Sequence, residues 1–247
     1  MDNGSTTQRQ SSALLLGRDH EALGKVAIAH PAGHVAIGLS AGLFAKGYPH
    51  VDPNEDAVFA ATDGEITVLA VADGHRGIEA SHAAVESIAA CTWPTETEAV
   101  EDVAMRLVAS ATHAIAAAVS ALPEPRRSSR TSLTVAIVRS GMIAAATVGD
   151  TSCHIATSHR ANRLGNSTEL LSDITDPLTI QVDRALMPSR SALFVSSDGI
   201  SDFKVDTAHL MRSVSHRNSR DGVDSLIGAA FGGGAGDNVS VGVLRSG

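Results

Sequence analysis

Cysteine is scarce in this chain of 247 residues, which contains only Cys91 and Cys153. Two cysteines are too few for a disulfide framework, and their spacing does not match that of a zinc site. The sequence also lacks a cysteine nucleophile motif, so no covalent intermediate on a thiol is expected. This composition fits the reducing environment of the cytoplasm.

Targeting signals and long apolar runs are lacking as well. The N-terminal residues show no basic segment followed by an apolar one, and no stretch approaches about 18 uncharged apolar residues. The formal net charge of −8 argues against nucleic acid or an anionic membrane as the main partner. We therefore expect a cytoplasmic protein with no nucleic acid and no membrane among its partners.

The overall composition is that of a folded domain, with 43% hydrophobic and 19% charged residues. The sequence contains no internal repeat and no convincing linker. We predict one domain over residues 13–247, preceded by a polar, disordered tail over residues 1–12.

Four aspartates lie where a short apolar run meets a turn: Asp73, Asp150, Asp198 and Asp237. The first three follow their apolar runs, whereas the fourth precedes its run. If the runs are neighbouring strands, the carboxylates gather at the sheet ends. Two carboxylates about 4 Å apart repel by roughly 4 kcal/mol at an effective dielectric constant of 20. Such a cluster requires cations, and oxygen ligands suit Mg²⁺, Mn²⁺ or Ca²⁺. The pattern predicts a carboxylate site for several metal ions.

The apolar periodicity predicts strands over residues 35–41, 58–62, 65–72, 133–139, 142–148, 153–157, 193–197 and 239–244. It predicts helices over residues 78–91, 207–216 and 221–231. A further helix is expected to begin at a capping box of Thr95 and Glu98 and to end near Leu122. Residues 158–188 are polar and poorly periodic.

The strand over residues 65–72 is apolar on both faces, which is typical of a strand inside a layered structure. The strands over residues 133–139 and 142–148 are joined by Ser140-Gly141, so they form a hairpin in an antiparallel sheet. Two consecutive helices separate the blocks of strands. These features predict an α+β layered sandwich.

Five short motifs carry a family resemblance: Asn54-Glu55-Asp56, Val71-Ala72-Asp73-Gly74-His75, Val148-Gly149-Asp150, Ser197-Asp198-Gly199 and Gly236-Asp237-Asn238-Val239-Ser240. In this order they resemble the metal-dependent serine/threonine protein phosphatases (the PPM, or type 2C, family) of the bacterial type with a single catalytic domain. The resemblance implies a four-layer α-β-β-α sandwich with two central antiparallel sheets flanked by helices.

The resemblance also implies a two-metal centre that binds Mn²⁺ or Mg²⁺. Asp73 matches the bridging carboxylate, and the carbonyl of Gly74 would bind one of the same ions. Asp198 and Asp237 match the ligands that complete the first metal site. Asp150 matches the ligand of a third, more weakly held ion.

Three further residues are implied in the chemistry around the ions. Glu55 and Asp56 match residues that hold metal-bound waters. His75 is placed to protonate the departing serine or threonine oxygen, because an imidazole titrates near neutral pH.

The sequence departs from the family pattern where the substrate binds. Many members hold the substrate phosphate with an arginine four residues before the glutamate, and here that position is Val51. Arg76 replaces a glycine of the usual Asp-Gly-His-Gly-Gly stretch. We predict that Arg76 takes over phosphate binding, because its planar guanidinium suits bidentate contact. Lys46 and His50 are weaker candidates.

The implied activity is hydrolysis of phosphoserine and phosphothreonine in proteins by a metal-bridged hydroxide. The partners would be phosphorylated proteins and an opposing serine/threonine kinase. One alternative is a phosphatase of the same fold that acts on an anti-sigma-factor antagonist, against which His75 argues. Another is a catalytically silent phosphoprotein-binding module. The short span between Asp150 and Asp198 predicts that the flap of many bacterial relatives is reduced or absent.

Overall fold

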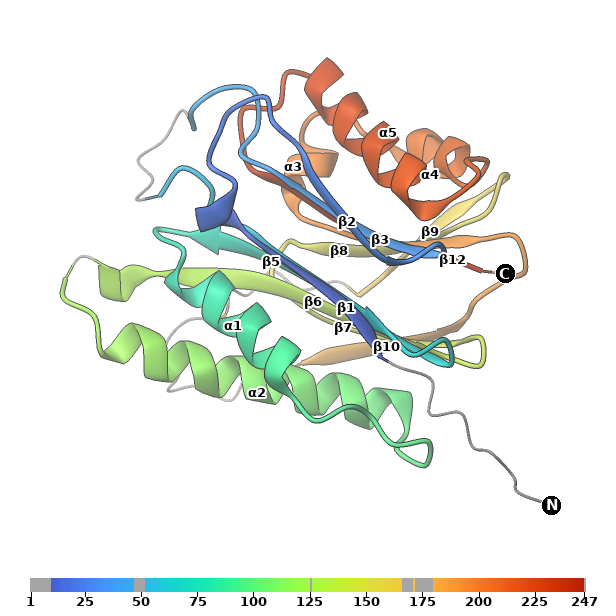
Figure 1. Ribbon diagram of the computed structural model, residues 1–247, viewed down its shortest axis with the longest axis horizontal. Helices are drawn as coiled ribbons and strands as arrows, with labels where there is room; N and C mark the ends of the chain where they lie inside the picture. Colours follow the sequence, from blue (N-terminus) through green and yellow to red (C-terminus); the bar gives the residue numbers. More distant parts are fainter. Residues whose placement is uncertain (1–9, 47–51, 125, 166–170, 172–179, 247) are drawn as a thin grey trace.

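The computed structural model describes residues 10–46, 52–124, 126–165, 171 and 180–246. Figure 1 shows four layers, in which two sheets lie face to face and helices cover the outer face of each. Both sheets are antiparallel. The predicted α-β-β-α sandwich is therefore confirmed.

Within the described residues each sheet contains six strands. The first sheet has the order β1 (Ser11–Leu16), β4 (Ala57–Thr62), β5 (Ile66–His75), β6 (Arg130–Arg139), β7 (Met142–Val148) and β10 (Gln181–Leu186). The second has the order β2 (Ala27–Ala32), β3 (Val35–Ser40), β12 (Val239–Arg245), β11 (Ala192–Ser196), β8 (Ser152–Ala156) and β9 (Ala161–Leu164).

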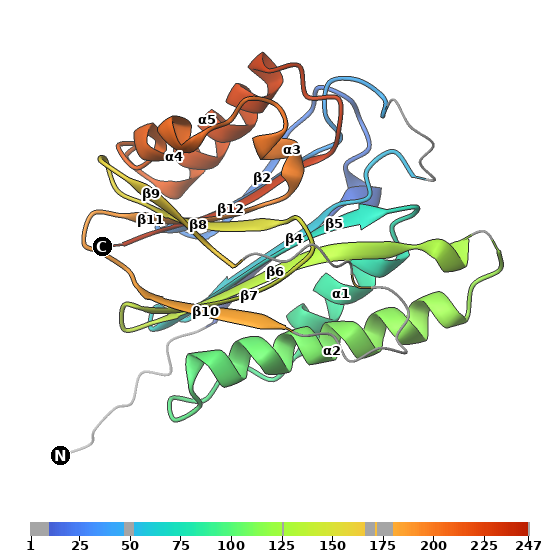
Figure 2. The ribbon, with the colours of Figure 1, turned by 180° about the vertical axis from the view of Figure 1, so that it is seen from behind.

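The helices form the outer layers. Helices α1 (Glu79–Ala90) and α2 (Val100–Ser120) lie against the first sheet. Helices α3 (Asp198–Ser201), α4 (Thr207–Ser213) and α5 (Ser219–Gly232) lie on the side of the second sheet, as the view from behind also shows (Figure 2). Short 3₁₀ turns cover Gly17–Asp19 and Arg126–Ser128.

Three apolar clusters hold the four layers together, one at each interface between layers. Strand β5 contributes to two of them because side chains alternate along a strand. Ala70 and Ala72 face α1 and α2, whereas Leu69 and Val71 face the second sheet. This confirms the strand apolar on both faces that the sequence predicts.

Helix α2 is, among the described residues, the one helix that is long and apolar enough by length and composition to cross a membrane. In this fold its apolar stripe is buried against α1, β6 and β7, through residues that include Val103, Leu107, Ala111 and Ile115. Helix α2 is thus part of the core of the sandwich.

Strand β5 is longer than predicted. It continues beyond Ala72, and residues 73–75 pair with residues 130–132 of β6. The Asp-Gly-His motif therefore lies within a strand, and the turn follows it. The apolar pattern ends at Ala72, but the hydrogen bonds of the sheet depend on the partner strand, which begins at Arg130.

The predicted capping box of Thr95 and Glu98 does not form. Helix α2 begins at Val100, and its N-cap residue Ala99 has no side-chain hydrogen bond. The carboxylate of Glu98 instead accepts hydrogen bonds from the guanidinium of Arg106 at 2.8 and 3.0 Å. A charge-assisted bidentate contact is stronger than a bond to a neutral backbone N–H.

The strands that the sequence analysis missed are β1, β2, β9 and β10, which are the edge strands of the two sheets. Edge strands are partly exposed and so show a weaker apolar pattern. Strand β1 begins at Ser11, so two residues assigned to the tail pair with β4. Predictions for residues 1–9, for His50 and Val51, and for most of the flap segment, 166–170 and 172–179, lie outside the described residues.

Candidate metal centre

The predicted site residues lie at one end of the sandwich, which we call the site end. Strand β4 begins directly after Asp56, and its neighbour β5 ends at His75. In the second sheet β11 ends two residues before Asp198, and its neighbour β12 begins two residues after Asp237. Antiparallel pairing explains why Asp237 precedes its strand.

Glycine permits close packing of the loops at this end. A β-carbon at Gly74 would lie 2.2 Å from the carbonyl oxygen of Glu55 and 2.8 Å from Oγ of Ser81. A β-carbon at Gly199 would lie 1.9 Å from the carbonyl oxygen of Asn238. These approaches exclude any side chain larger than hydrogen. The two Asp-Gly motifs are therefore packed directly against the Asn-Glu-Asp and Asp-Asn motifs.

Carboxyl groups crowd together at the centre of the site. Burial and the charges of Asp56 and Asp198 raise the pKa of Asp73 well above its ordinary value. Burial raises the pKa of Asp56 to about 7, although Lys46 and the hydroxyl of Ser240 act in the opposite direction. Burial also raises the pKa of Asp198 to about 6 against the effect of its hydrogen bond with Asp73. A bound cation would stabilise the ionised forms of all three groups.

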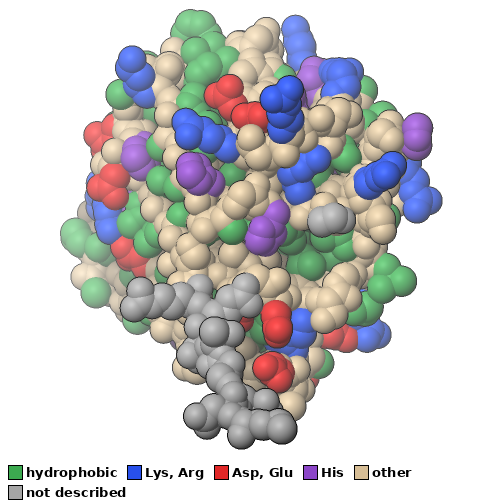
Figure 3. All heavy atoms as spheres, turned by 45° about the vertical axis from the view of Figure 1, so that its right-hand side comes forward, with side chains coloured by type: hydrophobic (Ala, Val, Ile, Leu, Met, Phe, Trp, Pro, Cys, Tyr) green, Lys and Arg blue, Asp and Glu red, His purple; other side chains and the backbone are tan. Residues whose placement is uncertain are grey.

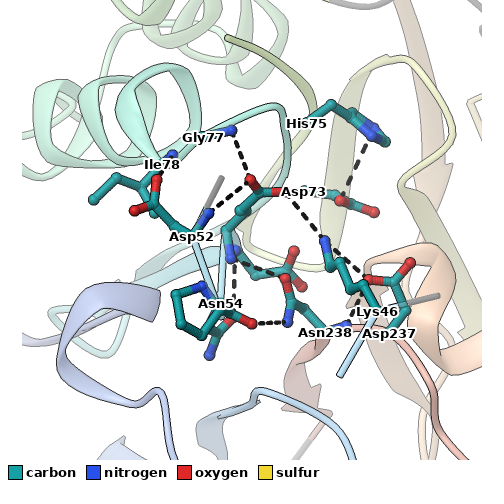
Figure 4. A network of polar contacts seen from close by, with 12 residues as sticks. Lys46, Asp52, Asn54, Asp73, His75, Gly77, Ile78, Asp237 and Asn238 are labelled. Carbon is teal, nitrogen blue, oxygen red and sulfur yellow. Dashed lines mark hydrogen bonds and ion pairs between the residues drawn. The ribbon is translucent and has the colours of Figure 1, made fainter. Parts of the chain in front are cut away.

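Asp73, His75 and Asp150 form a second group at the same end, with ligand atoms that all lie within 4.8 Å of one another. Nε2 of His75 is 3.9 Å from Oδ1 of Asp73, and Figure 4 shows the two side chains facing each other. Nε2 is buried and has no hydrogen-bond partner among the described residues. Burial lowers the pKa of His75, an effect that Asp150 opposes and Lys46 reinforces.

The carboxylate of Glu55 is held by protein groups. Its Oε1 accepts hydrogen bonds from the N–H of Gly77 at 2.6 Å and the N–H of Asp52 at 3.4 Å. Its Oε2 lies 3.3 Å from Nζ of Lys46. The backbone N–H of Glu55 donates to Oδ1 of Asn238 at 2.8 Å. Glu55 therefore connects the Asn-Glu-Asp motif to the loop after β5 and to Asn238, which directly precedes β12.

Lys46, a weaker candidate for phosphate binding in the sequence, instead contacts the predicted metal-site carboxylates Glu55 and Asp237. Its Nζ lies 3.0 Å from Oδ1 of Asp237, and its side chain is only 2% exposed. Burial alone would lower the pKa of Lys46, but Asp237, Asp56 and Glu55 together raise it above its ordinary value. The ammonium is therefore charged. No motif surrounds Lys46 in the sequence, so the sequence does not indicate that its ammonium lies among the predicted metal ligands.

Hydrogen bonds from neighbouring residues orient the aspartates. Oγ of Ser240 donates to Oδ2 of Asp56 at 2.7 Å, and Oγ1 of Thr131 donates to the carbonyl oxygen of Asp73 at 2.7 Å. The other carboxylate oxygen of Asp56, Oδ1, is buried without a hydrogen-bond partner among the described residues. Crowded buried carboxylates, with one oxygen of Asp56 left to accept a further hydrogen bond, fit a hard divalent cation and its bound water.

Arg76 differs from the other predicted site residues because it is exposed. It makes no hydrogen bond or ion pair with another residue in the described part of the chain. Its φ is +62°, in the left-handed region that favours glycine. This conformation accounts for the glycine that the family pattern has here. Across the sheet His75 pairs with the half-buried Arg130, so both side chains project from the face that meets the second sheet.

The comparison with protein families agrees with this geometry. The sequence model of the Protein phosphatase 2C family matches residues 50–227, which is most of the chain. The chain therefore belongs to the protein phosphatase 2C family. A search of curated protein sequences found no match.

Solved bacterial phosphatases share the fold. The serine/threonine phosphatase PstP/Ppp of Mycobacterium tuberculosis is 19% identical, with a TM-score of 0.70 over 90% of this chain and 98% of its own. The catalytic domain of PstP in complex with 2 manganese ions is also 19% identical, with a TM-score of 0.69 over 90% of this chain and 99% of its own. The phosphatase MsPP from Mycobacterium smegmatis, in complex with cacodylate, is 20% identical, with a TM-score of 0.61 over 92% of this chain and 100% of its own.

Proposed function

We propose that this protein hydrolyses phosphoserine and phosphothreonine in other proteins with Mn²⁺ or Mg²⁺ as cofactor. The observation that carries the proposal is the convergence of four aspartates from both sheets, Asp56, Asp73, Asp198 and Asp237. Asp56, Asp73 and Asp198 lie near enough to the other carboxylates that burial and the neighbouring charges raise their pKa values. Membership of the protein phosphatase 2C family supports it. The structural similarity to the PstP domain in complex with 2 manganese ions supports the choice of metal.

The ligands would be divided among the ions as the family resemblance implies. Asp73 and the carbonyl of Gly74 would hold the shared position, and Asp198 and Asp237 would complete the first site. Asp150, beside Asp73 and His75, would serve a third ion. When bound, a pair of divalent ions supplies an activated water and offsets charge on the phosphoryl oxygens. Glu55 and Asp56 would orient water, and the unpartnered Oδ1 of Asp56 is free to accept a hydrogen bond from it.

His75 would donate a proton to the departing oxygen of the serine or threonine. Its Nε2 is buried at the centre and has no hydrogen-bond partner among the described residues. Burial lowers its pKa, so the neutral ring is favoured before substrate binds. A phosphate dianion beside the ring would favour the protonated form, as would the nearby Asp150. The substrate would thus help to generate the acid that acts on it.

Arg76 would bind the substrate phosphate. Its exposed guanidinium is not engaged by other described residues, and it follows His75 directly. A non-glycine residue at positive φ costs about 1–2 kcal/mol. An unfavourable conformation of this kind is typical of functional positions, where the side chain contributes something that glycine cannot.

The biological setting follows from this chemistry. The substrates would be phosphorylated proteins, and a serine/threonine kinase of the same cell would oppose the enzyme. We also propose a cytoplasmic location, because a chain with only Cys91 and Cys153 fits a reducing compartment.

The test is hydrolysis of p-nitrophenyl phosphate and of a phosphothreonine peptide, with and without Mn²⁺. EDTA should abolish turnover of both substrates, and Mn²⁺ should restore it. Thiol-modifying inhibitors should have no effect, because no cysteine takes part. Full activity in a sample verified to be metal-free would overturn the proposal. Metal binding with no turnover of either substrate would instead indicate a phosphoprotein-binding module.

A further inference from the structure

The Lys46 ammonium lies among the side chains that are proposed to bind metal. Figure 4 shows Lys46 reaching toward Asp237 from a segment that precedes the Asn-Glu-Asp motif. Its Nζ contacts Oδ1 of Asp237 at 3.0 Å and Oε2 of Glu55 at 3.3 Å. The side chain of Lys46 is 2% exposed and that of Glu55 is fully buried, so water screens this contact poorly.

The oxygen of Asp237 that contacts Lys46 also accepts a second hydrogen bond. Oδ1 accepts a hydrogen bond from the backbone N–H of Asn238 at 2.7 Å, in addition to the contact with Lys46. A metal ion at Asp237 would therefore share the carboxylate with the ammonium or displace it from Oδ1. In either case two cations a few ångströms apart in a buried site repel each other.

We propose that Lys46 is a resident counter-cation of the centre, which stabilises the metal-free protein and competes with divalent metal for Asp237. This inference rests on the proposed function, because it takes Asp237 as a metal ligand. In the metal-free protein the ammonium offsets part of the repulsion among the buried carboxylates. When metal arrives, the same charge opposes binding. Lys46 thereby sets how much free metal is required to load the enzyme.

The geometry does not favour the other role considered for Lys46, that of phosphate ligand. Its ammonium is enclosed by the protein and directed at carboxylates, so a phosphate would have to draw it away from two anions. Arg76 and Arg130 present guanidinium groups at the same end without such partners among the described residues. Lys46 would therefore act on metal binding through its charge, and phosphate binding would fall to other residues.

The test compares Lys46→Met with wild type in the metal-free protein. Mn²⁺ binding is measured by isothermal titration calorimetry, and thermal unfolding is measured without metal. We expect Lys46→Met to bind Mn²⁺ about tenfold more tightly or better, and to unfold at a lower temperature without metal. Lys25→Met is the matched control, because Lys25 is an exposed lysine outside the centre. It should change neither quantity.

A second variant covers the case in which Lys46→Met does not fold without metal. Lys46→Gln keeps a hydrogen-bond donor but removes the charge, and it should show the same tighter Mn²⁺ binding. Unchanged or weaker Mn²⁺ affinity in the folded variant would overturn the inference. A raised KM with unchanged Mn²⁺ affinity would also overturn it and would make Lys46 a phosphate ligand. If wild type itself binds no Mn²⁺, it is the proposed function that fails.

Discussion

The two ends of the sandwich differ in how their charges are matched. At the site end, carboxyl groups are buried together. Among the described residues, Lys46 is the cation that forms an ion pair with Asp237. At the opposite end, which we call the far end, Lys, Arg and His side chains gather on the side of α4 and α5 (Figure 3). Arg217 and Arg220 there are exposed to water.

The far end also has a hollow between the sheets, with a volume of about 530 Å³ and a lining that includes His34, Glu65 and Arg245. The guanidinium of Arg245 donates to the carbonyl oxygens of Ser213 and Val214 at 3.4 and 2.7 Å. Its charge is satisfied by the protein. The guanidinium at the hollow thus has acceptors within the protein, whereas crowded buried charges of one sign at the site end require a counter-charge.

The largest expected effect comes from removing the central charge at the site end. Asp73→Asn should lose metal binding, and turnover should fall on the order of a thousandfold or more, because the proposed shared ligand is gone. Calorimetry with Mn²⁺ and a phosphatase assay measure both losses. Asp224→Asn, on an exposed position of α5, is the control and should behave as wild type.

Unchanged metal occupancy in Asp73→Asn would contradict the assignment of this ligand. Asp198→Asn and Asp237→Asn should resemble Asp73→Asn. Asp150→Asn should still bind two ions and should turn over slowly, if it serves a third ion as proposed.

The next largest effect concerns acid stability. His82 on α1 is 3% exposed, and neither ring nitrogen has a hydrogen-bond partner among the described residues. Burial, with a contribution from Arg18, lowers its pKa from 6.5 to about 4. Below pH 6.5 the unfolded chain therefore binds a proton that the folded chain does not. Stability from this group is complete above pH 6.5 and is lost as the pH falls toward 4.

The change His82→Leu should remove this sensitivity. The free energy of unfolding of His82→Leu minus that of wild type should be about 2–3 kcal/mol larger at pH 4.5 than at pH 7.5, because only wild type must protonate His82 on unfolding. Urea unfolding at the two pH values measures it. Asp56 and Asp198 have raised pKa values, so they have the opposite pH dependence: they destabilise the metal-free protein as the pH rises. If wild type and His82→Leu show the same pH dependence, His82 does not cause the loss of stability in acid. The control is His113→Leu, on the exposed face of α2.

A smaller effect is expected from the arginine proposed to bind phosphate. Arg76→Ala should lower kcat/KM by about ten- to a hundredfold, because a charge-assisted hydrogen bond contributes roughly 1.5–3 kcal/mol. Metal affinity should not change, and Arg76→Lys should recover only part of the loss. Arg190→Ala is a matched control, since Arg190 is also exposed and has a φ of +56°.

Steady-state kinetics with a phosphothreonine peptide decides the matter. Wild-type kinetics in Arg76→Ala would rule out the assignment. Arg130→Ala should then be tested, because Arg130 lies opposite His75 on the neighbouring strand.

The smallest effect is expected at Arg76 and Arg190, two exposed arginines with positive φ, where function and stability can be measured separately. Arg76→Gly and Arg190→Gly should each raise the free energy of unfolding by about 0.5–1 kcal/mol, since relief of the left-handed conformation exceeds the entropy cost of glycine. Only Arg76→Gly should lose activity. Chemical denaturation and the peptide assay measure the two properties in the same samples. A stability gain at Arg190 but none at Arg76 would show that Arg76 makes contacts that offset its backbone conformation.

Much of the fold could be predicted because its central strands are strongly apolar. The strands over residues 58–62, 142–148 and 193–197 were predicted to within one residue at each end. The edge strands were missed because one of their sides meets water. The prediction of a capping box is wrong because the carboxylate of Glu98 binds the guanidinium of Arg106, eight residues further along the chain. Local patterns do not contain that competition.

The sequence by itself determined which residues could form the centre. Each aspartate stands beside an apolar run, and each essential glycine stands beside an aspartate, so short-range order along the chain places the carboxylates at strand ends. Only the tertiary structure decided how they are arranged and what accompanies them. Ser240 reaches Asp56 across 184 positions of sequence, and Lys46 reaches Asp237 from the other end of the chain. Such contacts depend on how the two sheets are stacked, which is a property of the whole core and of no single motif.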